Sequence, residues 1–161
     1  MQIRNAVAGD AEAACQVMRR SITELCSADH RDDPDILRRW LGNKTPDGFM
    51  SWLRQPNNSV LVAVENDTVL AVGSVTDEGK ITLNYVSPDA RFRGVSRAML
   101  AALEGRAAER GNARCVLTST ETARRFYRAS GYVDDGAPVG AFGTNSGHPM
   151  TKMLKLQKSD V

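Results

Sequence analysis

The chain has 161 residues, of which 42% are hydrophobic and 25% are charged, and these values are typical of one soluble globular domain. Its 21 Lys and Arg and 19 Asp and Glu residues leave a net charge of +2, which argues against a strongly basic nucleic-acid-binding protein and against an acidic tail. No apolar run approaches the ~18 residues that a membrane helix needs. The first twenty residues carry three arginines and two acidic residues and lack the apolar segment of a secretory signal, so neither a membrane partner nor export is expected.

The cysteines indicate a reducing environment. Cys15, Cys26 and Cys115 are odd in number, and no two of them form a CxxC pair. Neither a disulfide framework nor a zinc site is therefore expected. We interpret all three as small buried hydrophobes of a cytoplasmic protein that holds no metal.

The N-terminal part of the chain predicts one strand followed by three helices. Residues 2–6 form a short strand candidate, and Asp10 is suited to cap the helix that follows. Apolar residues at three- and four-residue steps predict that this amphipathic helix continues to Leu25. Two shorter helices are expected to begin at Asp33–Pro34 and at Thr45–Pro46, because proline suits the first helical position.

The central part changes to a strand pattern. Residues 59–67, 68–79 and 80–88 are rich in β-branched and aromatic residues and are separated by acidic turns. They predict an antiparallel meander, which Pro88 ends.

Helical and strand patterns alternate in the remainder. A helix is expected over 94–110, a strand over 114–120, a helix over 121–130, and two further strands over 132–135 and 148–154. This order combines antiparallel hairpins with one βαβ crossover, so we predict an α/β fold with a mixed, mostly antiparallel central sheet flanked by helices. One domain is expected over 1–156, with a frayed tail at 157–161.

The loop at 89–96 carries the clearest chemical signal, because it leads from a strand directly into a helix. Backbone N–H groups and the helix dipole at such a point suit a phosphate or pyrophosphate. Gly94 permits close approach of the backbone, and Arg91, Arg93 and Arg97 add positive charge. The loop matches neither a P-loop nor the GxGxxG of a dinucleotide fold. The alternative is a tight turn with solvated arginines.

A second motif one strand later makes the assignment more specific. Residues 86–100 read V-x-P-x-x-R-x-R-G-x-S-R-A-x-L, and residues 123–132 read A-x-x-F-Y-x-x-x-G-Y. Together they resemble the GNAT superfamily, the Gcn5-related N-acetyltransferases, most strongly over 85–132 and more loosely over 2–154. The resemblance implies that two parallel strands are splayed apart and hold acyl-CoA between them, with acetyl-CoA as the donor.

The resemblance also implies a set of cofactor-binding residues. These are Tyr85, Val86, Arg91, Phe92, Arg93, Gly94, Val95, Ser96, Arg97, Thr120, Ala123, Phe126 and Tyr127. Two of these positions depart from the family pattern. Ser96 replaces the more usual Gly or Ala, and Thr120 stands where many members have Asn, so that Thr120 either contacts CoA or only caps a helix.

Two of the residues are implied to be catalytic. The N–H of Val86, at an expected bulge over Tyr85 and Val86, would face the thioester carbonyl as an oxyanion-hole-like donor. Tyr127 would protonate the departing CoA thiolate. The alternative for Tyr127 is an ordinary core tyrosine with its hydroxyl at the surface.

The acceptor side has no clear general base in the sequence. His30, Trp40 and Asn84 are candidate substrate-binding residues. The alternatives are an exposed loop histidine for His30 and a core position on an amphipathic helix for Trp40. The glycine-rich stretch 136–147, which precedes His148, is either a mobile wall of the acceptor site or a long hairpin connection.

Arginines also gather on the helix that carries Tyr127. Arg124, Arg125 and Arg128 either reach the CoA phosphates or form a solvated helix face. The low net charge argues against a nucleic-acid partner.

The sequence therefore predicts a cytoplasmic, acetyl-CoA-dependent N-acetyltransferase that works by direct attack of an amine in a ternary complex. The acceptor is a small-molecule or peptide amine that the sequence does not identify. The alternatives are a non-catalytic acyl-CoA-binding or sensor domain on the same fold and an interaction domain that has lost the cofactor. Homodimers are common in the family, and no feature of this sequence decides the oligomeric state.

Overall fold

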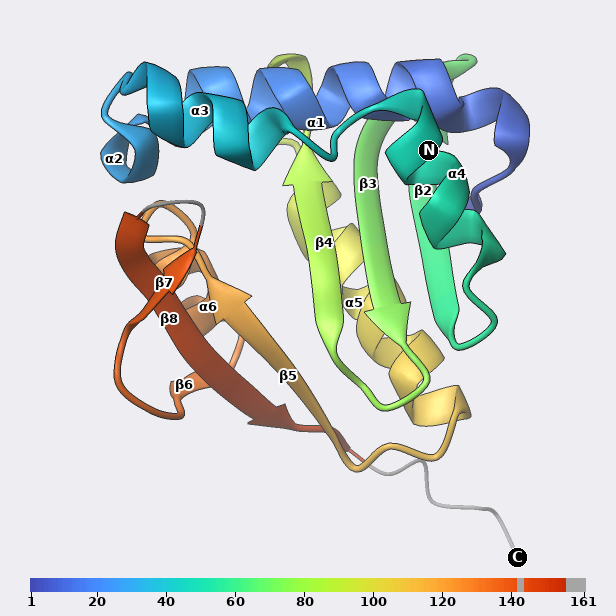
Figure 1. The fold of residues 1–161 in the computed structure, drawn as a ribbon. Coiled ribbons are helices and arrows are strands. Elements are labelled where there is room, and N and C mark those ends of the chain that lie inside the picture. The colour runs from blue at the N-terminus through green and yellow to red at the C-terminus, as the bar shows by residue number, and fades with distance from the viewer. Residues whose placement is uncertain (142–143, 156–161) are drawn as a thin grey trace, which may run out of the picture.

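A computed structural model of the chain describes residues 1–141 and 144–155 (Figure 1). The elements follow in the order β1 (Gln2–Asn5), η1 (Ala8–Asp10), α1 (Ala11–Leu25), α2 (Ser27–His30), α3 (Pro34–Leu41), α4 (Pro46–Arg54), β2 (Asn58–Glu65), β3 (Thr68–Thr76), β4 (Ile81–Val86), η2 (Pro88–Ala90), α5 (Val95–Glu109), β5 (Arg114–Ser119), α6 (Arg124–Ala129), β6 (Val133–Asp134), β7 (Val139–Ala141) and β8 (Thr144–Met153). The expected tail at 157–161 lies outside the described residues.

The described strands form two sheets that lie side by side. β1, β2, β3 and β4 pair in that order, each antiparallel to its neighbour. β8 pairs with β5, β6 and β7 in the second sheet. This mixed α/β architecture confirms the predicted fold class.

β4 and β5 run parallel but separate along most of their length (Figure 1). They are joined near their starts by an isolated parallel bridge between Lys80 and Val116, where Val116 N donates to Gly79 O at 3.0 Å. Beyond that bridge the two strands diverge, as the splayed pair implied by the sequence motifs requires. The sheets therefore open into a V between β4 and β5.

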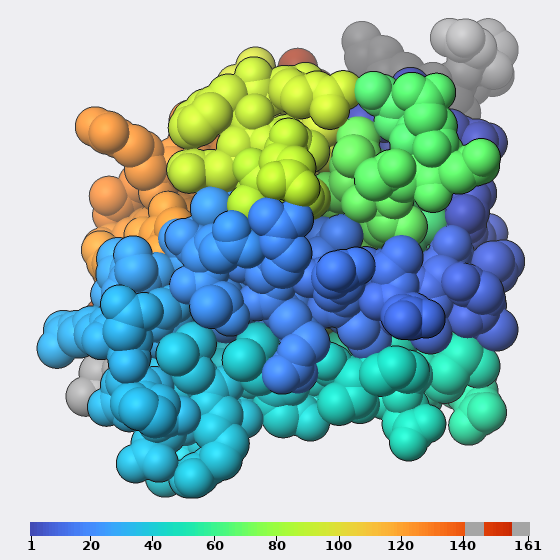
Figure 2. Space-filling view, turned by 90° about the horizontal axis from the view of Figure 1, so that it is seen from above, coloured from blue at the N-terminus to red at the C-terminus, as the bar shows by residue number. Residues whose placement is uncertain are grey.

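Helices cover both faces of the first sheet, which explains why its strands are apolar on both faces. Leu61, Ala63 and Ala71 pack with α5, whereas Val62 and Val72 lie in the cluster that includes α1 and α4. This alternation follows from the two-residue period of a strand. Seen from above, α1 crosses the molecule between η2 on one side and α3 and α4 on the other (Figure 2).

Two local expectations differ from the structure. Asp10 stands at the N-cap position of α1, but its carboxylate accepts hydrogen bonds from Arg4 and from Val7 N, at 2.8 Å, instead of capping the helix. The arginine competes successfully for the carboxylate because a charged donor makes the stronger hydrogen bond. In addition, the short helix α2 follows α1 directly and was not expected from the sequence.

The cysteines are buried and free, as predicted. Cys15, Cys26 and Cys115 have exposed fractions of 4%, 7% and 0% and form no disulfide with one another. Across 1–141 and 144–155, no helix combines the length and the apolar character needed to cross a membrane.

Candidate functional site

Two cavities meet where β4 and β5 separate. The larger, about 660 Å³, extends from this opening to the loop before α5. The smaller, about 440 Å³, lies on the side of α3, α4 and the start of β8. The residues that line both are Ile81, Thr82, Leu83, Tyr85, Thr118 and Thr120. The two cavities therefore adjoin at the opening between the strands.

The larger cavity ends at the N-terminus of α5, where the backbone forms an anion-binding loop. Gly94 is the N-cap residue with φ +79°, and the first turn of α5 holds no acidic residue. A Cβ at Gly94 would meet nothing within 4 Å, so the backbone conformation, not a lack of space, is what favours glycine here. The helix dipole and the first amide groups of α5 favour a negative charge at this point.

The arginines around this loop have different surroundings. Arg91 and Arg97 line the larger cavity. The Arg91 guanidinium lies 4.6 Å from the ring centroid of Phe92, which is 93% exposed. Arg93 does not line the cavity, and its guanidinium pairs with Glu65 Oε1 at 2.8 Å.

The structure brings nearly all of the residues assigned to the cofactor into this one cavity. Those that line it are Tyr85, Val86, Arg91, Phe92, Gly94, Val95, Ser96, Arg97, Thr120, Ala123, Phe126 and Tyr127. They come from β4, the loop before α5, the first turn of α5, the turn between β5 and α6, and α6. Segments far apart in the sequence thus form one continuous wall.

Tyr127 is a buried phenol at the middle of this wall. Its exposed fraction is 6%, and its ring packs edge-on against Phe126 and Tyr132. Asn84 Nδ2 donates a hydrogen bond to Tyr127 Oη at 3.0 Å. Burial raises the pKa of Tyr127 to about 12, although the hydrogen bond from Asn84 opposes that shift. The phenol therefore keeps its proton throughout the neutral pH range.

Asn84 and the strand bulge lie elsewhere than the sequence suggested. Asn84 lines the larger cavity beside Tyr127 and not the smaller one. The register between β3 and β4 shifts between Ser74 and Val75, opposite Thr82, so the irregularity precedes Tyr85 and Val86. The expected position of the bulge was therefore wrong by several residues.

The smaller cavity is lined by many polar residues and by both tryptophans. Trp40 is 3% exposed, and its Nε1 donates to Tyr85 Oη at 3.1 Å. Burial raises the pKa of the Tyr85 phenol well above its usual value. Trp52 forms another part of the wall. The hydrogen bond between Trp40 and Tyr85 thus connects α3 to β4 beside the opening between the strands.

Lys44 also lines the smaller cavity, and the sequence reasoning missed it. It is 2% exposed, and its Nζ donates to Asn43 Oδ1 at 2.6 Å and to Trp40 O at 3.3 Å. Burial lowers the pKa of Lys44 to about 8. No sequence pattern marks this lysine, since its burial depends on how the segment between α3 and α4 packs beside Tyr85.

His30 lines neither cavity. It is fully buried, its Nε2 donates to Ile22 O at 3.0 Å, and its Nδ1 accepts from Asp32 N at 2.9 Å. Both ring nitrogens are thus used by the backbone, and the alternative of an exposed loop histidine was wrong. The ring connects the end of α1 to the turn after α2.

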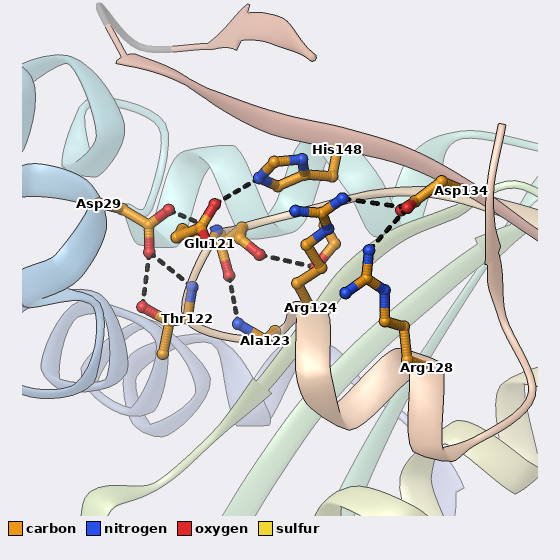
Figure 3. Close-up of polar contacts among 10 residues, drawn as sticks. Asp29, Glu121, Thr122, Ala123, Arg124, Arg128, Asp134 and His148 are labelled. Atoms are coloured by element: carbon orange, nitrogen blue, oxygen red, sulfur yellow. Dashed lines mark hydrogen bonds and ion pairs between the residues drawn. The ribbon is translucent and has the colours of Figure 1, made fainter. Parts of the chain in front are cut away.

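A buried carboxylate connects α2 to the turn before α6 (Figure 3). Asp29, 5% exposed, accepts hydrogen bonds from Glu121 N at 2.7 Å, from Thr122 N at 3.2 Å and from Thr122 Oγ1 at 2.6 Å. Within the same turn, Thr120 Oγ1 accepts from Ala123 N at 3.1 Å. Thr120 therefore closes the turn before α6, whose N-cap residue is Ala123, and Asp29 holds the next two residues of that turn.

His148 and the arginines of α6 surround this turn (Figure 3). His148 Nε2 is hydrogen-bonded to Glu121 Oε2. Arg124 and Arg128 both pair with Asp134, at 3.0 Å and 2.7 Å, and Arg125 is exposed. The glycine-rich stretch before His148 contains β7, which pairs with β8, so the hairpin expected as an alternative is present.

Comparison with known proteins identifies this architecture. Residues 35–154 match the family model described as the acetyltransferase (GNAT) domain. No curated protein sequence matches the chain. Among solved structures, a GCN5-related N-acetyltransferase from Rhodopseudomonas palustris is 24% identical over 95% of both chains, with a TM-score of 0.84.

Two further solved structures share the fold at lower identity. The PaiA N-acetyltransferase from Thermoplasma acidophilum, solved in complex with coenzyme A, is 16% identical over 95% of this chain and 98% of that one, with a TM-score of 0.81. The ribosomal-protein-S18-alanine N-acetyltransferase from Escherichia coli is 16% identical over 99% of this chain and 97% of that one, with a TM-score of 0.70. The family model spans well over half of the sequence and includes most of the residues that line the two cavities. The chain therefore belongs to the GNAT family of acetyltransferases.

Proposed function

We propose that this chain is an acetyl-CoA-dependent N-acetyltransferase, in which an amine attacks the thioester directly within a ternary complex. One observation carries the proposal: the two cavities share lining residues of β4 and β5 at the opening between these strands. One cavity ends at an anion-binding helix N-terminus and contains a buried phenol, while the other lies on the side of α3 and α4. Donor and acceptor would thus enter from opposite sides and meet at this opening.

The residues of the larger cavity fit a CoA donor. The N-terminus of α5, with Gly94 in the left-handed region, supplies amide donors and a favourable dipole for the pyrophosphate. Arg91 and Arg97 add positive charge on the same wall. The pantetheine arm would then follow the wall formed by Ala123 and Phe126 towards Tyr127.

The hydrogen-bond pattern of β4 supports a role for Val86 as oxyanion donor. Ser87 N donates to Leu70 O of β3 at 2.7 Å. Because N–H groups of successive residues in an antiparallel strand point to opposite edges, the N–H of Val86 points away from β3 and towards the opening. A backbone donor at this edge would stabilise the negative charge that develops on the thioester oxygen.

Tyr127 is the proposed acid. A thiolate leaving group is stabilised when a nearby phenol donates a hydrogen bond or its proton. Asn84 donates to the phenol oxygen and so leaves the phenolic hydrogen for an acceptor in the cavity. The raised pKa of Tyr127, about 12, keeps that hydrogen in place before the reaction.

The cysteines support direct transfer over a covalent acyl-cysteine route. Cys26 lines the larger cavity, but burial raises the pKa of its thiol to about 12. Burial also raises the pKa of Cys115 to about 11 and that of Cys15 above its usual value. Since the thiolate is the reactive form, none of the three is prepared to accept an acetyl group.

Calorimetric titration with acetyl-CoA tests donor binding. We expect micromolar binding by the wild type and none by Gly94→Asp, which places a negative charge at the phosphate site. Gly94→Asn is the matched control, because Asn has the same shape, tolerates a positive φ about as well as Asp and carries no charge. Binding that is lost equally in both variants would indicate backbone damage and would leave the loop assignment without support.

A thiol-release assay with a panel of amines then tests the transfer step. Turnover of at least one amine supports the transferase. Donor binding without turnover of any amine would favour a non-catalytic acyl-CoA sensor. Absence of donor binding by a well-folded wild type would contradict the enzyme proposal.

A further inference from the structure

Phe92 places an exposed aromatic ring at the end of the larger cavity. It lines that cavity, and it is 93% exposed. The other exposed large hydrophobic side chains in the described part of the chain do not line the cavity; they are Met1, Val7, Val133, Val139 and Met153. Burial of the ring in the core therefore does not explain a phenylalanine here, and its position beside the cavity points to a ligand.

The backbone of the loop holds this ring outward. Phe92 has φ +63°, a left-handed conformation that bulky side chains rarely adopt. The loop is fixed on both sides, because Ala90 and Val95 are buried in the core, with exposed fractions of 1% and 3%. Arg93, the next residue, pairs with Glu65. A strained conformation of this kind persists only where its surroundings impose it, and such residues gather at ligand sites.

One face of the Phe92 ring carries a cation. The Arg91 guanidinium lies 4.6 Å from the ring centroid, which is the distance of a cation–π contact. Because Phe92 is 93% exposed, most of the ring remains open to solvent. Every nucleobase has a flat π-face that stacks on an aromatic side chain. A phosphate-bearing nucleotide also complements the charge of the two arginines, Arg91 and Arg93, that flank the ring along the chain.

The distance from the ring to the anion-binding loop limits the ligand further. Phe92 precedes Gly94 by two residues, so their Cα atoms are at most ~7.6 Å apart. Gly94 begins the N-terminus of α5, the proposed site of the pyrophosphate. In CoA a single ribose separates the adenine from the pyrophosphate. An adenine can therefore reach the Phe92 ring while the pyrophosphate lies at the start of α5.

We propose that Phe92 stacks on the adenine ring of the CoA donor, while Arg91 contacts the phenyl ring of Phe92. This inference rests on the proposed function, since it assigns a subsite of the same donor site. Phe92 is then a specificity-determining residue: it distinguishes a donor that carries the nucleotide from one that carries only phosphopantetheine, such as an acyl carrier protein.

Truncated donors test the subsite. Acetyl-CoA is compared with acetyl-3′-dephospho-CoA, which keeps the adenine, and with S-acetyl-4′-phosphopantetheine, which lacks it. We expect Phe92→Asn to weaken binding of the first two donors about 10-fold in calorimetry and to leave binding of the third unchanged. Phe92→Tyr, which keeps a flat ring, should bind acetyl-CoA as the wild type does. Unchanged binding of acetyl-CoA by Phe92→Asn, or equal weakening for all three donors, would overturn the inference.

The stability of the variant separates recognition from folding. The Phe92 ring is exposed and its backbone is strained, whereas asparagine tolerates a positive φ better. Phe92→Asn should therefore raise Tm or leave it unchanged, and thermal unfolding measures this. A variant that is at least as stable as the wild type yet binds acetyl-CoA less tightly supports the proposal. A fall in Tm would indicate that the ring stabilises the loop itself and would contradict the assignment.

Tryptophan fluorescence gives a second readout that does not need turnover. Phe92→Trp places an indole at the proposed subsite, and stacking with adenine should quench its emission beyond any change in the wild type, whose tryptophans are Trp40 and Trp52. CoA and 3′-dephospho-CoA should cause this quenching, and 4′-phosphopantetheine should not. CoA binding without the additional quenching would refute the adenine subsite alone. Absence of CoA binding by the folded wild type would refute the proposed function as well.

Discussion

Asn84 Nδ2 donates to Tyr127 Oη at 3.0 Å, from β4 to α6, on the wall of the larger cavity. A phenol oxygen can accept and donate. Because Asn84 can only donate through its amide nitrogen, the phenolic hydrogen is left for a second partner. The phenolic hydrogen of Tyr127 is thus available to an acceptor in the larger cavity, where we propose that the leaving thiolate lies.

Tyr127→Phe is expected to lower kcat by about 10²–10⁴-fold, the usual contribution of a general acid, with little change in the affinity for acetyl-CoA. Steady-state kinetics and calorimetry measure the two effects separately. Tyr132→Phe is the matched control, because Tyr132 is also buried but donates to Glu104 Oε2 at 2.7 Å, away from the reaction. It should lower stability but not kcat. Unchanged turnover in Tyr127→Phe would rule out the acid role.

Asn84→Ala should lower kcat about 10-fold through a misoriented phenol, and this loss should depend on Tyr127. In the Tyr127→Phe background the same substitution removes no hydrogen bond to a hydroxyl, so it should have little further effect. A double-mutant cycle on kcat measures this coupling. Additive losses in the double variant would show that Asn84 acts independently of Tyr127.

Asp29→Asn should destabilise the fold by about 1–3 kcal/mol, since the amide nitrogen cannot accept the hydrogen bonds that one carboxylate oxygen now receives. Binding of acetyl-CoA should also weaken several-fold, because the turn that Asp29 holds contains Thr120 and Ala123, which line the larger cavity. Urea unfolding and calorimetry measure the two effects. Asp32→Asn is the control, since the Asp32 side chain is 84% exposed. Equal effects at both positions would contradict the role of Asp29.

The buried Lys44 should make stability depend on pH in the alkaline range. Burial lowers its pKa from 10.5 to about 8, so between these values the unfolded chain binds a proton that the folded chain has lost. Stability therefore rises with pH in this window, by up to about 1.4 kcal/mol per unit. Urea unfolding at several pH values should show that Lys44→Met lacks this contribution and that Lys80→Met retains it. If the stability of the wild type and that of Lys44→Met changed with pH in parallel, the contribution of Lys44 would be refuted.

The local pattern of the sequence determined most of the elements, the family and the glycine-containing loop before α5. Proline at Pro34 and Pro46, glycine at Gly94 and the two motifs act through nearest neighbours along the chain, so their consequences can be predicted without knowing the fold. The same holds for the turn that Thr120 closes, since its partner, Ala123 N, is three residues away.

Only the tertiary structure decided which distant side chains meet around the two cavities. The charge and position of Lys44, the contact between Asn84 and Tyr127 and the three hydrogen bonds of Asp29 join residues that lie 43 or more positions apart, or depend on packing against such residues. Neither hydropathy nor spacing encodes which distant side chains will meet. His30 shows the same limit, because its burial follows from how α1 and α2 fold back on each other, and that arrangement has no signature in the local sequence.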